Sequence, residues 1–145
     1  IMCCIDTSGS LTGKQLHLIL SEVYAMALQK KPISLAIVMC DTKIQDVQIF
    51  NNMKDFKRAI KNYEIKGGGG TDMKPCWDLL QKDPRFVKRN CELFMMFTDG
   101  YLDQIARDKR KMNNLCWCIT DNPGFQLEHK DAKTFVVHLD SSTIK

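Results

Sequence analysis

Apolar runs bounded by turn residues alternate along this chain with segments in which apolar residues recur at helical spacing. Runs that are apolar throughout are typical of strands buried on both faces of a parallel sheet. The predicted strands of the sheet are residues 1–5, 33–40, 92–97, 115–119 and 134–139. The pattern therefore predicts an α/β fold, a doubly wound and mostly parallel sheet with helices on both faces.

The segments with helical period complete this plan. Residues 11–29 form the clearest helix, because their apolar side chains recur every three or four positions and Pro32 follows the end. Shorter helices are predicted at residues 53–60, from Pro75 onward and at 102–112. Residues 46–50 alternate apolar and polar side chains after a very short connection, which demands an antiparallel hairpin. The expected sheet thus has about six strands, one of them an antiparallel edge strand.

Length and composition indicate one folding unit. The chain has 145 residues, of which 44% are hydrophobic, so it can bury one sizeable core. We expect a single domain over residues 1–145, cut from a longer protein because the chain begins directly on strand-like residues. Its longest apolar runs are far shorter than the ~20 residues of a membrane helix, so no membrane segment is predicted.

The cysteines indicate an intracellular, cytoplasmic protein. There are seven, an odd number, and neighbours such as Cys3 and Cys4 would point to opposite faces of a strand. We therefore expect free thiols in a reducing compartment, with which the absence of any Asn-x-Ser/Thr acceptor agrees. Cys116 and Cys118 would share one face of a strand, as buried small hydrophobes rather than zinc ligands.

The net charge of +4 does not by itself indicate a nucleic-acid partner. Basic residues cluster on the helical segments near residues 54–61 and 107–111, where a solvated helix face explains them. The one aromatic residue among them, Phe56, belongs with Met53 and Ile60 to the apolar positions of its predicted helix, so no series of aromatic residues is interleaved to stack on bases. No nucleic-acid partner is expected.

Four apolar runs end in the same way, with an aspartate at the turn. These residues are Asp6, Asp41, Asp99 and Asp121. The carboxyl ends of parallel strands meet at one edge of a sheet, where ligands bind. Aspartate also ends strands and caps helices, so two or three of the four could be capping alone. Four carboxylates at one edge of a basic chain favour a cation site.

The turn after residue 5 supplies the densest group of oxygen donors. Asp6, Ser8 and Ser10 alternate along the chain, and an intervening glycine permits a sharp backbone path that lets their oxygens converge. Thr71 and Asp99 lie on further loops of the same predicted edge. Carboxylate and hydroxyl oxygens suit Mg²⁺, Mn²⁺ or Ca²⁺ rather than zinc or copper.

Three segments together resemble the von Willebrand factor type A family. "DTSGS" at 6–10 matches its Asp-x-Ser-x-Ser signature, "GGGGTD" at 67–72 its threonine loop, and "FTDGYLD" at 97–103 its later aspartate segment. The resemblance implies a Rossmann-like sheet with a metal-ion-dependent adhesion site, or MIDAS. In that pattern Ser8 and Ser10 touch the metal directly, Thr71 does so directly or through water, and Asp6 and Asp99 act through water. A partner's carboxylate completes the shell.

The resemblance is greatest to intracellular bacterial and viral members. Some of these belong to predicted metallopeptidase proteins, and others work beside AAA-type ATPases. This chain has neither a His-Glu-x-x-His motif nor a Walker lysine, so neither activity is carried over. Outer-shell or partner-contact roles fall to Asp41, Asp72, Asp103, Tyr101 and Gly70.

Binding rather than catalysis is the expected output, because no general base or nucleophile pair accompanies the oxygen donors. The expected partner is a protein that offers an acidic side chain, or another domain of the parent chain. One alternative is a magnesium-dependent phosphoryl-transfer enzyme that uses Asp6, although Ser8 stands where such sites carry a second acidic residue. The other alternative is a metal-free structural module.

Overall fold

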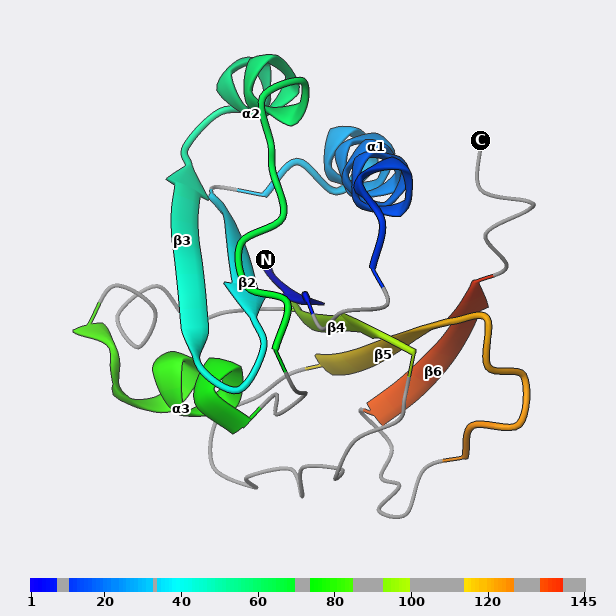
Figure 1. Ribbon diagram of the computed structural model, residues 1–145. Helices are drawn as coiled ribbons and strands as arrows, with labels where there is room; N and C mark the ends of the chain where they lie inside the picture. The colour runs from blue at the N-terminus through cyan, green and yellow to red at the C-terminus, as the bar shows by residue number, and fades with distance from the viewer. Residues whose placement is uncertain are drawn as a thin grey trace.

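A single sheet organises the molecule (Figure 1). The computed structural model describes residues 1–7, 11–32, 34–69, 74–84, 93–99, 114–126 and 134–139. Within these ranges the strands are β1 (Met2–Asp6), β2 (Leu35–Cys40), β3 (Ile44–Phe50), β4 (Leu93–Thr98), β5 (Asn114–Thr120) and β6 (Thr134–Leu139). Their order across the sheet is β3-β2-β1-β4-β5-β6. All neighbouring pairs are parallel except β2 and β3.

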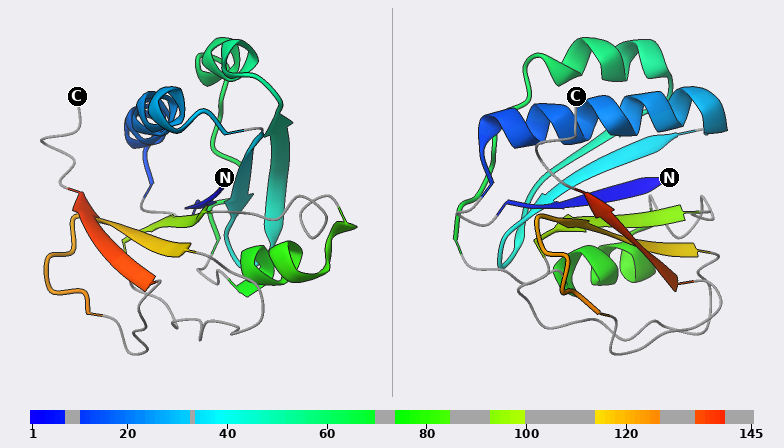
Figure 2. Two further views of the ribbon diagram at one scale, coloured as in Figure 1. Left: turned by 180° about the vertical axis from the view of Figure 1, so that it is seen from behind. Right: turned by 90° about the vertical axis from the view of Figure 1, so that its right-hand side faces the viewer.

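Helices cover both faces of the sheet. Helices α1 (Gly13–Lys30) and α2 (Met53–Ile60) lie on one side and α3 (Lys74–Lys82) on the other, as Figure 2 shows from two further directions. The first helix begins at a capping box, in which Thr12 and Gln15 exchange hydrogen bonds with each other's backbone N–H groups. It ends at Lys31, which adopts a left-handed conformation (φ 49°) before Pro32.

The central strands are buried on both faces, so alternate residues enter two separate cores. Cys4, Phe94, Met96 and Trp117 pack on the side of α3, whereas Cys3, Ile5 and Ile37 pack beneath α1 and α2. Each large side chain buried in this way stabilises the fold by about 1.5–3 kcal/mol. The predicted division of Cys3 and Cys4 between opposite faces is confirmed.

The other cysteines also agree with the sequence. Cys116 and Cys118 share the α1 side of β5, with their Sγ atoms 3.7 Å apart. All six cysteines that the structure describes are buried free thiols.

The predicted elements are found where the structure describes them. The run at 46–50 lies in β3, the antiparallel edge strand, and the helix predicted over 11–29 is α1. The predicted helix at 102–112 lies outside the described residues. In the described part of the chain, none of the helices has the length and apolar character that crossing a membrane requires.

Candidate metal centre at the carboxyl edge of the sheet

The four strand-end aspartates stand in a row, because β2, β1, β4 and β5 are adjacent and parallel. Across the sheet their order is Asp41, Asp6, Asp99 and Asp121, which confirms that the four share one edge. Their surroundings differ. Asp6 and Asp41 are buried, with 5% and 6% of their surface exposed, whereas Asp99 is half-buried and Asp121 is exposed.

Asp121 is a turn residue. It adopts a left-handed backbone conformation (φ 54°), which aspartate tolerates better than most residues. The next residue, Asn122, donates its side-chain N–H to the backbone carbonyl of Asp99 at 2.8 Å. The end of β5 therefore supports the end of β4, and Asp121 itself is exposed.

Asp6 links the first strand to the fourth. The Thr98 hydroxyl donates to Asp6 Oδ2 at 2.7 Å, although the two residues are 92 positions apart. A buried carboxylate requires hydrogen bonds because it has lost its contact with water. Since Thr98 immediately precedes Asp99, this bond sets the ends of β1 and β4 against each other.

Asp41 is held by neutral donors. Its Oδ1 accepts from the Gln45 side-chain amide at 2.9 Å and from the Lys43 backbone N–H at 3.1 Å, and its Oδ2 accepts from the Gly69 N–H at 3.2 Å. These bonds, the one from Gln45 foremost, lower the pKa of Asp41 from 3.8 to about 2. Asp41 therefore keeps its negative charge next to the end of β1, where Asp6 lies.

The glycine segment, residues 66–69, passes directly over these strand ends. The fully buried Thr7 donates its hydroxyl to the Lys66 carbonyl at 2.6 Å, and its own N–H donates to the Cys40 carbonyl at 2.9 Å. Gly67 has a φ of 114°, and a Cβ atom there would lie 2.7 Å from Thr7 Oγ1. A Cβ on Gly69 would lie 3.2 Å from Asp41 Oδ2. Glycine is needed here for close backbone approach to Thr7 and Asp41.

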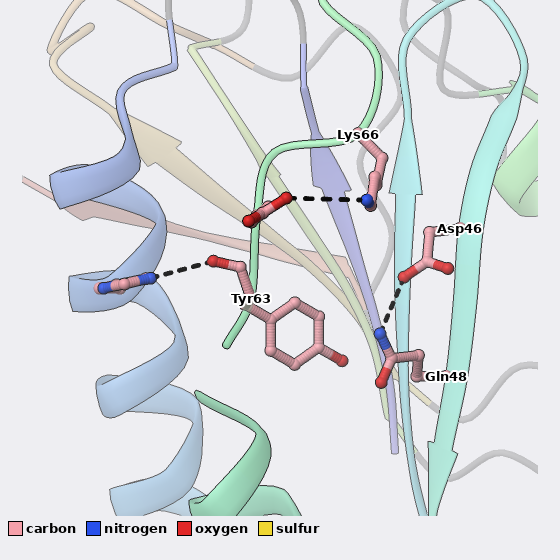
Figure 3. Close-up of polar contacts among 6 residues, drawn as sticks. Asp46, Gln48, Tyr63 and Lys66 are labelled. Atoms are coloured by element: carbon pink, nitrogen blue, oxygen red, sulfur yellow. Dashed lines mark hydrogen bonds and ion pairs between the residues drawn. The ribbon is translucent and has the colours of Figure 1, made fainter. Parts of the chain in front are cut away.

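The chain that leads into the glycine segment is anchored to α1. His17 Nε2 lies 3.1 Å from the carbonyl oxygen of Tyr63, so this histidine has a structural contact. Figure 3 shows Tyr63 and Lys66 on this stretch, together with Asp46 and Gln48 of β3, whose side chains are hydrogen-bonded to each other. An exposed ion pair joins Lys66 to Glu64 at 3.9 Å.

Part of the predicted site lies among the described residues. Asp6, Asp41 and Asp99 are at the carboxyl edge as expected. The other predicted positions, Ser8, Ser10, Gly70, Thr71, Asp72, Tyr101 and Asp103, lie outside the described residues. In the ranges that the structure covers, no three His, Cys, Asp or Glu side chains form a group that could hold a metal ion.

Sequence reasoning missed three contributors to this edge, namely Thr7, Gln45 and Thr98. Thr7 and Thr98 each stand beside a motif aspartate, and this adjacency was the available signal. Their hydrogen-bond partners, Lys66 and Asp6, lie 59 and 92 positions away in the chain. No local pattern reports contacts over such separations.

Comparison with known proteins decides the family. The family described as "VWA-like domain (DUF2201)" matches residues 1–127. The chain belongs to this VWA-like family. An uncharacterized protein of Thermotoga maritima is 32% identical to this VWA-like domain over 108 residues, which make up 74% of the chain and 24% of that relative. The VWA-like domain thus spans about a quarter of the relative's length.

Solved structures share the fold of the VWA-like domain. The conserved hypothetical protein BatB from Bacteroides thetaiotaomicron has a TM-score of 0.69 at 10% identity, over 96% of this chain and 89% of that protein. Proximal thread matrix protein 1 from the mussel byssus, solved with a zinc-occupied MIDAS motif, also has a TM-score of 0.69 at 10% identity, over 99% of this chain and 44% of that protein. VWA-like domains are in general protein interaction modules.

The described donors fit a hard divalent cation. Asp6 and Asp99 provide carboxylate oxygens, and Asp41 adds a buried negative charge that is hydrogen-bonded to neutral donors. Carboxylate oxygen is the ligand type that Mg²⁺, Mn²⁺ and Ca²⁺ prefer, and a nearby anion favours their binding.

Proposed function

We propose that this VWA-like domain binds an acidic group of a protein partner, or of another domain of its parent chain, through a divalent cation. The observation that carries the proposal is the pair of buried carboxylates, Asp6 and Asp41, at the carboxyl ends of two central strands. A bound cation would neutralise this charge and leave a position for a partner's carboxylate.

The proposed ligands follow the motif. Ser8, Ser10 and Thr71 would hold the ion, Mg²⁺ or otherwise Mn²⁺ or Ca²⁺, while Asp6 and Asp99 would act through bound water. The zinc-occupied MIDAS of the mussel protein supports a metal site in a domain of this fold. The buried free thiols support a location of the protein in a reducing, intracellular compartment.

The residues at this edge favour binding over phosphoryl transfer. Ser8 stands where a phosphoryl-transfer site usually carries a second acidic residue. The Thr98 hydroxyl donates to Oδ2 of Asp6 at 2.7 Å and fixes the orientation of this carboxylate. A fixed carboxylate suits a residue that positions bound water.

A matched pair of variants tests the proposal. Asp6→Asn and Asp121→Asn each remove one negative charge from the same edge, one at the buried strand end and one at the exposed turn. Titration calorimetry with Mn²⁺ should show binding to the wild-type domain, at least about tenfold weaker binding to Asp6→Asn, and wild-type affinity in Asp121→Asn.

Two results would contradict the interaction function. One is equal Mn²⁺ affinity in wild type and Asp6→Asn. The other is Mg²⁺-dependent hydrolysis of a generic phosphate ester that Asp6→Asn abolishes, which would indicate the enzyme instead.

A further inference from the structure

The structure ties the glycine segment to two strand ends by contacts that do not involve the motif's metal ligands. Thr7, at the end of β1, donates to the Lys66 carbonyl, and Asp41, at the end of β2, accepts from the Gly69 N–H. These bonds engage both ends of residues 66–69. Thr71, the threonine of the motif, follows Gly69 by two positions.

The Asp41 carboxylate is held in place by its own turn as well as by its bond to the glycine segment. Its Oδ1 is bound within the β2–β3 connection, by the Lys43 N–H and the Gln45 amide, which leaves Oδ2 directed at Gly69. Asp41 therefore acts as a rigid acceptor on the sheet. The fully buried Thr7 is equally constrained, because its N–H is bonded to the Cys40 carbonyl.

Two of the glycines lie so close to Thr7 and Asp41 that a side chain there would crowd these residues. A side chain at Gly67 would collide with the Thr7 hydroxyl, and one at Gly69 would press on Asp41 Oδ2. A Cβ on Gly68 would meet nothing within 4 Å, so the tight fit is confined to the two glycines beside Thr7 and Asp41. The fit is therefore specific to the backbone of this segment.

We propose that Thr7 and Asp41 are positioning residues of the metal site, which hold the glycine segment on the strand ends and thereby place the chain that continues into Thr71. The inference rests on the proposed function. It makes metal affinity depend on two residues that do not touch the metal.

The neutral variant Thr7→Val gives the sharper test, since it removes the hydroxyl without changing charge. Mn²⁺ binding should weaken by about tenfold, within the range for residues that support metal ligands. Thr7→Ser keeps the hydroxyl and should restore wild-type affinity. The control is Thr42→Val, because Thr42 also follows a strand-end aspartate but is exposed.

Asp41→Asn keeps one oxygen of the Asp41 side chain and replaces the other with an NH₂ group. The asparagine oxygen can still accept from Lys43 and Gln45, but its NH₂ group would then face the Gly69 N–H, donor against donor. In metal-free protein, hydrogen exchange should accelerate at Gly67–Gly69 and stay unchanged in β1, β2 and β4.

The outcomes separate this inference from the proposed function. If Asp6→Asn loses Mn²⁺ but Thr7→Val and Asp41→Asn bind it like wild type, the positioning roles are overturned and the function stands. If Thr7→Ser binds as weakly as Thr7→Val, the hydroxyl is not the cause and the inference again fails. A wild-type domain that binds no Mn²⁺ overturns the function, and this inference with it.

Discussion

At the scale of single residues, residues of the same type have different surroundings and therefore different roles. Asp6 and Asp121 both end a central strand, yet Asp6 is buried against Thr98 whereas Asp121 is exposed in a left-handed turn. Adjacent glycines differ in the same way, since a Cβ on Gly67 would collide with Thr7 whereas a Cβ on Gly68 would meet nothing within 4 Å. The cost of a substitution depends on these surroundings.

Gly67→Ala should destabilise the domain by about 1–3 kcal/mol, because alanine is strained at φ 114° and its Cβ would lie 2.7 Å from Thr7 Oγ1. Gly13→Ala is the control. A Cβ there meets nothing within 4 Å, and alanine favours the helix, so this variant should gain about 0.4–1 kcal/mol. Urea unfolding followed by circular dichroism measures both, and equal stabilities would show that the contact at Gly67 is unimportant.

At the scale of elements, polar side chains cap the N-termini of two helices. Thr12 and Gln15 form the capping box of α1, and Asn52 caps α2 by accepting from the Asp55 N–H at 2.9 Å. Each cap satisfies backbone N–H groups that the helix leaves without partners. The first cap matters more for the site, because α1 begins shortly after the motif turn at 6–10.

Thr12→Ala should cost about 1 kcal/mol, since it removes the acceptor for the Gln15 N–H. Thr12→Ser keeps that acceptor and should stay close to wild type. Thermal unfolding measures the difference. A Thr12→Ala domain as stable as wild type would mean that water replaces the cap without loss.

At the scale of the whole molecule, the sheet separates two cores that each contain three of the described thiols. Cys4, Cys40 and Cys76 lie on the α3 side, and Cys3, Cys116 and Cys118 lie on the α1 side. The hydrogen bond with the neighbouring thiol Cys4, together with burial, raises the pKa of Cys76, which disfavours the reactive thiolate. The thiols on both sides are buried by the packing of helices against the same sheet.

Labelling of the native domain with a maleimide should therefore leave these six cysteines unmodified until the domain unfolds. Peptide mapping by mass spectrometry at increasing urea should show both groups becoming reactive together, at the midpoint seen by circular dichroism. Labelling of one group well below that midpoint would show that the two cores open independently.

The sequence by itself determined the strands and helices that the structure describes, and the edge of the sheet at which Asp6, Asp41 and Asp99 lie. These properties follow from local periodicity and from the rule that parallel strands end together, so short windows of residues contain them. Only the tertiary structure decided which donors meet at that edge. Thr7 and Lys66 are 59 positions apart, Asp41 and Gly69 are 28 apart, and Asp6 and Thr98 are 92 apart. Packing of the whole chain creates these contacts, and they distinguish the buried carboxylates from the exposed one.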